Sequence, residues 1–328
     1  MSIPLSKLEF YEEILKKKAY EEYEIWISNF ALNLTNIWKE KSASSLIPQH
    51  ESSSRYGLVI GKGPSIKKRE HLRILAESDF SGSIICCDGK LIDVLKAGIT
   101  PDKFHNFFVV TVDPLPAIKK HYDHEIVNSY GKKIKGVFST VTHPDAVERA
   151  RIAGIDIHWV HSLADLHEGK KSFNYITSIM TRSKNHSNGL PAIQTGGNVG
   201  TSSWFVGWKI LKCNNVGLIG INHGWEEDDP WDLILSHTLN NNEMPTEPIN
   251  FDRTTEIFKR LFPTIHNPDL KTNCILDPIF QLYRSALIEF IQRSPEWVTT
   301  YNATEGGSIF GKRVNSITLK DFIRKSKT

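Results

Sequence analysis

Residues 56–65, Tyr-Gly-Leu-Val-Ile-Gly-Lys-Gly-Pro-Ser, join a short apolar run to a glycine-rich turn. The consecutive apolar residues 58–60 are typical of a strand covered on both faces. Gly61 and Gly63 permit a sharp turn and a close approach of backbone N–H groups to a ligand, and Ser65 is placed to cap a following helix. The stretch therefore predicts strand, turn and helix, and the turn is either a phosphate site or a plain connection.

The same alternation recurs along the chain, and it predicts the fold. Further apolar runs predict strands at 83–87, 107–112, 136–140, 156–160 and 216–220, and helices are expected over 65–77, up to about residue 97 and over 200–212. Alternating strands and helices predict an α/β, Rossmann-like, doubly wound and mainly parallel sheet with helices on both faces. Residues 298–302 are expected to form a short final strand, and Thr318–Asp321 has the spacing of a capping box that begins a closing helix.

The segments outside this pattern suggest three parts. Residues 1–54 are expected to form an N-terminal helical arm, helical over 5–41, followed by a serine-rich linker or mobile loop over 42–54. Residues 55–228 would form a nucleotide-binding core. Residues 229–328 would add a C-terminal extension that is mostly helical and packs on the core. The arm could pack on the domain or form an oligomer contact, and the sequence leaves both open.

Composition narrows the functional classes. The 40 basic and 37 acidic residues give a net charge of +3, which argues against a dedicated nucleic-acid binder. The four cysteines lack metal-ligand spacing, so we expect free thiols in a reducing, cytoplasmic setting. The first residues contain no apolar signal core, and no run approaches the roughly 18 apolar residues that span a bilayer.

Polar residues follow most of the predicted strands. In parallel α/β sheets, ligands bind at the carboxyl ends of the strands, so these residues are site candidates, although turns there are polar in every such fold. They are Gly61–Ser65, Asp88, Thr111 with Asp113, Thr142 with His143, and Asn222 with His223. A metal site built from Asp88, Asp113 and the acidic run 226–229 has no diagnostic spacing. The acidic run by itself is typical of a solvated loop.

A second glycine stretch, residues 195–203, precedes an amphipathic helix. Its backbone N–H groups could hold a phosphate or carboxylate, or its glycines could let the helix pack closely on the sheet. The stretch is not a Walker A motif, because no Gly-Lys-Ser/Thr follows. The first turn lacks the third glycine of a dinucleotide site, which disfavours an NAD-dependent dehydrogenase. His223 could act as a general acid or base, or could only hydrogen-bond its turn.

Taken together, the chain resembles a known family over about residues 56–322. The matching stretches are Gly61–Ser65, Cys87–Gly89, Leu95–Asp102, Val110–Pro114, Gly196–Thr201, Leu218–His223 and Tyr301–Gly307. They resemble the Rossmann-like domain shared by archaeal 6-hydroxymethylpterin diphosphokinase (MptE-like) proteins and the motility accessory factor (Maf) flagellin glycosyltransferases. The N-terminal arm is expected to lie outside this resemblance.

The resemblance implies a transferase with a nucleotide donor. On the Maf side, it implies transfer of a nonulosonic acid from a CMP-sugar to a protein hydroxyl, with His223, His143 and Asp113 as catalytic candidates. The nucleotide would be held by Gly61, Gly63, Pro64, Ser65, Asp88, Thr111, Gly196, Gly197, Asn198, Gly200 and Thr201. On the MptE side, it implies transfer of diphosphate from ATP to a hydroxymethylpterin, with Mg²⁺ held by acidic residues.

Two stretches favour the Maf side. The third strand ends in a single aspartate, Asp113, where the MptE-like enzymes and the similar thiamin pyrophosphokinases carry an Asp-rich end. The stretch Asn302–Gly307 also looks closer to the Maf pattern. A catalytically silent nucleotide-binding protein is the third reading that the sequence leaves open.

Overall fold

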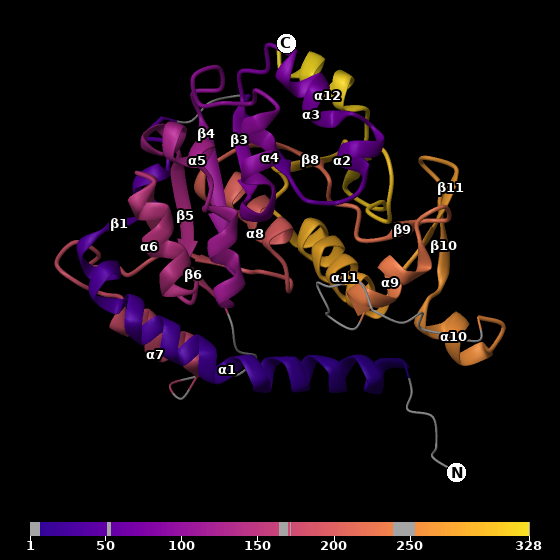
Figure 1. The fold of residues 1–328 in the computed structure, drawn as a ribbon, viewed down its shortest axis with the longest axis horizontal. Coiled ribbons are helices and arrows are strands. Elements are labelled where there is room, and N and C mark those ends of the chain that lie inside the picture. The colour runs from indigo at the N-terminus through magenta and orange to yellow at the C-terminus, as the bar shows by residue number, and fades with distance from the viewer. Residues whose placement is uncertain (1–6, 51–53, 164–169, 171, 239–252, 328) are drawn as a thin grey trace.

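The computed structural model describes residues 7–50, 54–163, 170, 172–238 and 253–327, and a central sheet runs through it (Figure 1). In the described residues ten strands form this sheet, and every pairing is parallel. Its order is β1-β6-β5-β4-β3-β2-β8-β12-β13, with β7 beside β6. The strands are β1 Lys41–Ser42, β2 Tyr56–Ile60, β3 Ser83–Cys87, β4 Phe107–Thr111, β5 Lys135–Ser139, β6 Asp156–Ser162, β7 Ala192–Ile193, β8 Asn215–Ile219, β12 Thr299–Asn302 and β13 Val314–Ser316.

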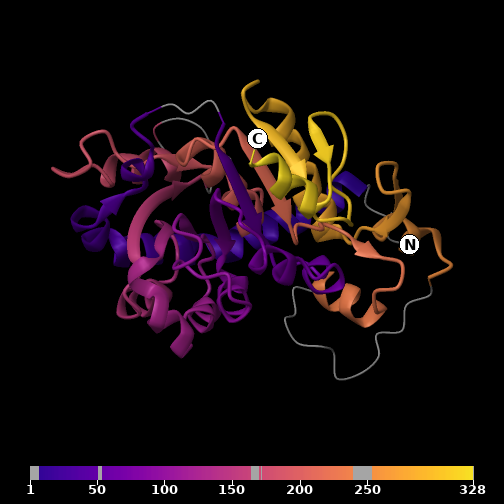
Figure 2. The same ribbon diagram turned by 90° about the horizontal axis from the view of Figure 1, so that it is seen from above.

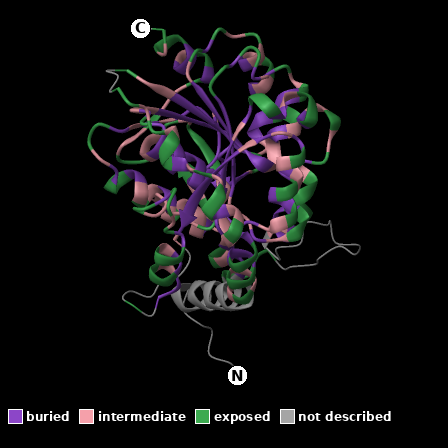
Figure 3. Ribbon diagram, turned by 90° about the vertical axis from the view of Figure 1, so that its left-hand side faces the viewer, coloured by how far each residue is buried: buried purple, intermediate pink, exposed green. Residues whose placement is uncertain are grey.

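Both faces of the sheet are buried, which confirms the predicted α/β fold (Figure 3). Leu58 and Ile60 of β2 face one apolar cluster, and Val59 between them faces the other, as alternation along a strand requires. The first face is covered by α1 Lys7–Lys39, α3 His71–Ala76, α4 Leu91–Lys96, α5 Glu125–Tyr130, α6 Pro144–Ile152, α7 Phe173–Met180 and α12 Leu319–Lys325. The second is covered by α8 Val199–Phe205, its π-helical continuation Val206–Ile210, and α11 Pro278–Arg293.

The chain reverses its direction across the sheet at β2. From β2 it proceeds outward through β3, β4, β5 and β6, and then returns to place β8 on the other side of β2. The boundary between β2 and β8 is therefore the topological switch point, where the loops that leave two neighbouring strands diverge. In open α/β sheets this is the preferred place for a ligand.

The C-terminal third contains more strand than the sequence pattern indicated. Residues 230–295 were expected to be mostly helical and loop-like, yet β10 Thr264–Asn267 and β11 Thr272–Ile275 form an antiparallel pair that extends onto β9 Trp225–Glu226. Helices α9 Trp231–Thr238 and α10 Glu256–Leu261 pack on this small sheet. Strands β12 and β13 join the central sheet itself, as Figure 2 shows for the yellow end of the chain. The extension is thus partly continuous with the core.

The N-terminal arm packs on the domain through α1. The side chains of Asn29 and Asn33 are buried and donate hydrogen bonds to carbonyl oxygens in the loops after β4 and β5. Residue 41, expected to end the helix, and residues 42–46, expected to begin the linker, instead form β1 and a 3₁₀ turn with Ala43 buried. Residues 51–53 of the predicted linker lie outside the described residues. No helix in the described ranges is long and apolar enough to cross a membrane.

The helix predicted over 65–77 is two short helices. Helix α2 spans Ser65–Lys68, and α3 begins at His71 after Glu70 adopts a left-handed φ of 52°. Ser65 does not cap a helix, because it is the first residue of α2 and its hydroxyl points elsewhere. The capping box predicted at Thr318 is confirmed, since its hydroxyl accepts the Asp321 N–H at 3.1 Å.

Candidate functional site

The turn after β2 and the loop after β8 are in direct contact at the switch point. The N–H of Gly61 donates to the carbonyl oxygen of Ile219 at 2.8 Å, and that of Gly63 donates to Gly220 at 2.9 Å. A Cβ atom at Gly63 would lie 2.1 Å from Oδ1 of Asn222. Glycine is required here by the approach of two loops, and these two N–H groups serve the fold.

Ser65 extends this contact into the interior. Its hydroxyl donates to Oδ1 of Asn222 at 2.9 Å, and both residues are buried. Pro64 precedes it with helical backbone angles and occupies the position before α2. The first glycine turn therefore fixes the geometry of the loop after β8 as well as its own.

Asp88, directly after β3, is the most strongly perturbed carboxyl at this edge. Only 4% of the residue is exposed, and Oδ1 accepts the Gly89 N–H at 2.6 Å, while Oδ2 has no hydrogen-bond partner among the described residues. Burial, with a further contribution from the charge of Asp113, raises the pKa of Asp88 to about 7. A carboxyl that titrates near neutral pH can both accept and release a proton there.

Two further residues complete this cluster: His121, which was not predicted from the sequence, and Lys62, which lies within the predicted turn Gly61–Ser65. His121 lies with Nδ1 at 3.8 Å from Oδ1 of Asp88, and burial lowers its pKa to about 4, so the ring is neutral at pH 7. Lys62, exposed between the two glycines, lies beside Gly89 and favours the ionised form of Asp88. The position of Lys62 in the glycine turn was a usable signal, whereas His121 sits in a 3₁₀ helix that only the tertiary structure brings to β3.

Thr111 and Asp113, both predicted from the sequence, lie next to Asp88 at the end of β4. The Thr111 hydroxyl is hydrogen-bonded to the phenol of Tyr122, and Oδ1 of Asp113 accepts the Leu115 N–H at 2.9 Å. In the described residues no group of three or more His, Cys, Asp or Glu side chains is arranged to hold a metal ion. Asp88 and Asp113 are a pair of carboxyl groups that follow the neighbouring strands β3 and β4.

The second glycine stretch reaches the same edge from the other face. Asn198 caps α8 by accepting the Thr201 N–H at 2.9 Å, and its amide donates to the Thr201 hydroxyl at 3.1 Å. A Cβ at Gly200 would lie 2.7 Å from Ile221, and one at Gly197 would lie 2.6 Å from the ring of Tyr283. Gly196 and Gly197 also have positive φ angles of 54° and 82°. Close packing is therefore one demonstrated reason for these glycines.

His223 and His143 occupy very different places. His223 is 6% exposed, has a φ of 40°, and lies against the rings of Phe280 and Tyr283. Burial lowers its pKa to about 3, and its Nδ1 is buried without a hydrogen-bond partner in the described part of the chain. His143 instead caps α6 by accepting the Asp145 N–H at 3.2 Å. Four strand spacings separate β5 from β8, roughly 19 Å, so the two histidines do not share one centre.

A histidine–aspartate pair beside His223 was not found from the sequence. Nδ1 of His237 lies 2.6 Å from Oδ2 of Asp277, which is fully buried and also accepts the Trp225 indole N–H at 2.7 Å. Oδ1 of Asp277 caps α11 through the Phe280 N–H. These contacts join α9, β9 and α11 next to the loop that follows β8.

The acidic run 226–229 is only partly the solvated loop that was expected. Lys68 of α2 lies within 3.0 Å of carboxylate oxygens of Glu226, Asp228 and Asp229, and the Asp229 side chain is 5% exposed. Burial opposes the charge of Lys68, but its hydrogen bonds to these carboxylates raise its pKa overall. The acidic run thus connects the small sheet to α2, the helix that follows the first glycine turn.

Comparisons with known proteins agree with this architecture. The family model of 6-hydroxymethylpterin diphosphokinase MptE-like proteins matches residues 28–228, so the match includes the end of α1 that carries Asn29 and Asn33, contrary to the expectation for the arm. A solved structure of the MAf glycosyltransferase from Magnetospirillum magneticum AMB-1 is similar in fold, with a TM-score of 0.53 at 15% sequence identity over 90% of this chain.

The present chain spans 41% of that solved chain. No curated protein matches the sequence. The matched family takes its description from a diphosphokinase, which is a transferase, so the family match agrees with the enzyme class predicted from the sequence.

Proposed function

Because this chain belongs to the family of 6-hydroxymethylpterin diphosphokinase MptE-like proteins, we propose that it is a transferase that uses a nucleotide-linked donor at the carboxyl edge of its sheet. The more specific proposal is glycosyl transfer, with a CMP-linked nonulosonic acid as donor and a protein hydroxyl as acceptor. The MAf glycosyltransferase fold and the single aspartate after β4 support this choice.

The observation that carries the proposal is the state of Asp88. A buried carboxyl with one unpartnered oxygen, next to the switch point, is costly unless a ligand or a reaction uses it. Its pKa of about 7 suits a general base that takes a proton from an attacking hydroxyl. We therefore assign this role to Asp88 ahead of His223 and His143.

The proposed step balances with the residues present. The acceptor oxygen forms a bond to the anomeric carbon, the bond from that carbon to the CMP phosphate oxygen breaks, and the electron pair leaves with CMP. The acceptor proton moves to the Asp88 carboxylate. Lys62, a flexible cation beside Asp88, would stabilise the charge that develops on the departing phosphate.

A diphosphokinase is the second candidate, and the proximity of Asp88 to Asp113 favours it. Mg²⁺ is commonly held by one or two protein carboxylates together with substrate phosphates, so this pair fits such a role. Bound Mg²⁺ would neutralise charge on the ATP phosphates. Asp88 and Asp113 would hold it, and Lys62 would again face the phosphate chain.

The test is a thermal-shift panel with CMP, CDP, CTP, ATP and GTP, with and without Mg²⁺. Stabilisation by cytidine nucleotides without metal supports glycosyl transfer, and stabilisation by ATP or GTP that requires Mg²⁺ supports the diphosphokinase. The variant Lys62→Gln should weaken either response, while Lys96→Gln, an exposed lysine on α4, should not. A cytidine response without turnover of any CMP-sugar would favour a non-catalytic binding protein. No response to any nucleotide would contradict the proposal.

A further inference from the structure

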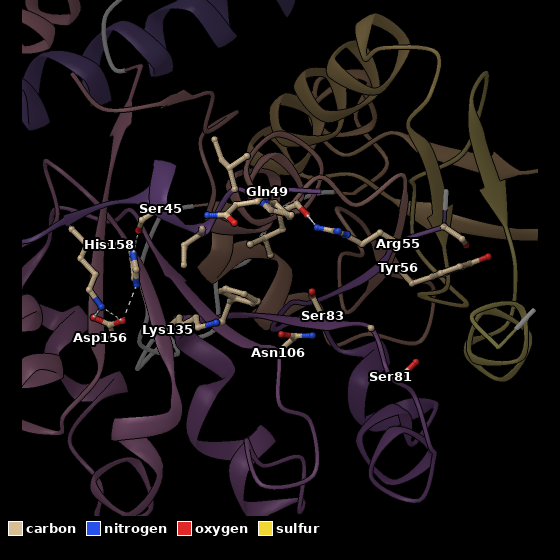
Figure 4. A pocket seen from close by; sticks show the side chains of 18 of the residues that line it. Ser45, Gln49, Arg55, Tyr56, Ser81, Ser83, Asn106, Lys135, Asp156 and His158 are labelled. Atoms are coloured by element: carbon tan, nitrogen blue, oxygen red, sulfur yellow. Dashed lines mark hydrogen bonds and ion pairs between the residues drawn. The ribbon is translucent and has the colours of Figure 1, made fainter. Parts of the chain in front are cut away.

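The amino edge of the central sheet holds a cavity of about 790 Å³ (Figure 4). Asp88 follows the last residue of β3 and therefore lies at the opposite edge, where the strands end. Its wall combines the first residues of β2 to β6 with residues 45–49 and 54–55, which lie between β1 and β2. This volume lies within the range of small-molecule pockets, roughly 300–1,000 Å³. Neither glycine stretch contributes to it, so it is separate from the carboxyl-edge site.

The charge of the cavity is positive. Its lining contains Lys41, Arg55 and Lys135 against one carboxylate, Asp156. The Asp156 carboxylate is already paired, because Nζ of Lys41 lies 2.7 Å from Oδ2 and Nε2 of His158 lies 3.0 Å from the same oxygen. Burial lowers the pKa of His158, so this ring adds no charge at pH 7. Among the described residues of the wall, an excess of two positive charges remains.

The two remaining cations have no carboxylate partner among the described residues. Lys135 makes no ion pair there, and its Nζ lies 5.4 Å from the centre of the Phe108 ring. Within the described part of the chain, the Arg55 guanidinium donates to two backbone carbonyl oxygens, those of Leu211 at 3.2 Å and His50 at 3.3 Å. A guanidinium and an ammonium that face one cavity, with no carboxylate paired to them in the described ranges, favour a doubly charged anion.

The rest of the wall favours a polar ligand over an apolar one. Figure 4 shows Asn106, Ser83 and Lys135 along one side and Gln49 with Arg55 across from them. Amide and hydroxyl groups can bond ligand hydroxyls in either direction, because each can donate and accept. The half-buried Tyr56 ring adds an aromatic surface to the wall, against which an apolar face of a ligand can pack.

From this combination we propose that the amino edge is a second binding site, which takes a small phosphorylated and hydroxylated molecule of the sugar-phosphate class. Lys135 and Arg55 bind the phosphate, and Asn106, Ser83 and Gln49 bind the hydroxyl groups. Arg55 immediately precedes β2, and Leu211 follows the π-helical turn after α8. A ligand here therefore contacts the amino end of β2 and the carboxyl end of the helix that begins with α8, and both elements build the carboxyl-edge site.

The test is isothermal titration of the full chain with inorganic phosphate, glucose 6-phosphate and glucose. We expect glucose 6-phosphate to bind more tightly than phosphate, and glucose alone to bind undetectably. Lys135→Gln should weaken binding of glucose 6-phosphate about tenfold. Asn106→Ala, an exposed position, should weaken glucose 6-phosphate but not inorganic phosphate.

Two controls separate this site from the proposed transferase site. Lys96→Gln, on the surface of α4, and Lys62→Gln, at the carboxyl edge, should both leave glucose 6-phosphate binding unchanged. Hydrogen exchange should slow in residues 45–50 and 81–84 when the ligand is present. The proposal is overturned if no phosphorylated probe binds at millimolar concentration, or if Lys62→Gln abolishes binding while Lys135→Gln does not.

Discussion

The hydroxyl of Ser65 donates a 2.9 Å hydrogen bond to Oδ1 of Asn222, and thereby joins the turn after β2 to the loop after β8. Both residues are buried, so the bond forms away from competing water. It lies at the point where the chain reverses its direction across the sheet. The relative placement of the two loops at the candidate site depends on this contact.

Gly63→Ala should destabilise the protein. The new Cβ would lie 2.1 Å from Oδ1 of Asn222 and 2.7 Å from the carbonyl oxygen of Gly220, so at least one loop must move. We expect a loss of about 3 kcal/mol in the free energy of unfolding, measured by urea titration. Gly89→Ala is the matched control, because its nearest contact would be 3.4 Å and its stability should change little.

The pH dependence of stability should report Asp88. Its folded pKa of about 7 lies above the ordinary 3.8, so between these values the folded protein holds a proton that the unfolded chain releases. The contribution of Asp88 to the free energy of unfolding is therefore greatest below pH 3.8. It decreases as the pH rises to about 7 and does not change further above that pH. Asp88→Asn should gain stability over wild type across this window, by up to about 4 kcal/mol. An equal difference between the two proteins at pH 4 and pH 8 would contradict the assignment.

The same carboxyl should control activity. With Asp88 as general base, turnover should rise with pH and level off above an apparent pKa of about 7. Asp88→Asn should lower turnover by roughly 10²–10⁴ and remove this rising limb. His143→Gln, which alters the N-cap of α6, should keep the wild-type pH profile. If the pH profile of Asp88→Asn is the same as that of wild type, the Asp88 carboxyl is not the base.

Helix α1 should depend on its two asparagines. Asn33 donates to the carbonyl oxygens of Thr140 and Thr142, at 3.2 and 2.8 Å, so Asn33→Ala leaves two buried acceptors unpaired. We expect a loss of about 1–3 kcal/mol in unfolding free energy. Leu32→Ala, one position earlier and 65% exposed, should cost under about 0.5 kcal/mol. Similar losses for both variants would show that the helix is not held by these bonds.

Asp277 should be important for the small sheet and its helices. Asp277→Ala removes the acceptor for Trp225 and His237 and the cap of α11, and we expect a loss of at least about 3 kcal/mol. Asp232→Ala, at an exposed position of α9, is the matched control. Near-ultraviolet circular dichroism of the tryptophans would detect local loosening that a global unfolding curve averages out.

Local pattern was sufficient for the individual strands. Consecutive apolar residues such as Ile84 and Ile85 are buried on opposite faces, and that requirement is visible in the sequence because both must be apolar. The polar residues that follow the strands could also be predicted from local pattern, because they stand directly after each apolar run. Asp88, Thr111 and Asp113 do lie together, since parallel strands end at one edge.

Other features depend on contacts between distant segments. The β10–β11 pair was missed because its residues, half of them exposed, carry no clear apolar alternation. His121 and the His237–Asp277 pair gave no local signal, because their partners lie tens of residues away in the chain.

The sequence by itself determined that this chain forms parallel strands with glycine turns at their carboxyl ends, because burial on two faces and tight turns restrict residue type locally. Only the tertiary structure decided what those turns do. The amides of Gly61 and Gly63 bond the loop after β8, and Ser65 binds Asn222 instead of capping a helix. The order of strands across the sheet sets these partners, and that order arises from packing between segments more than 150 residues apart in the chain.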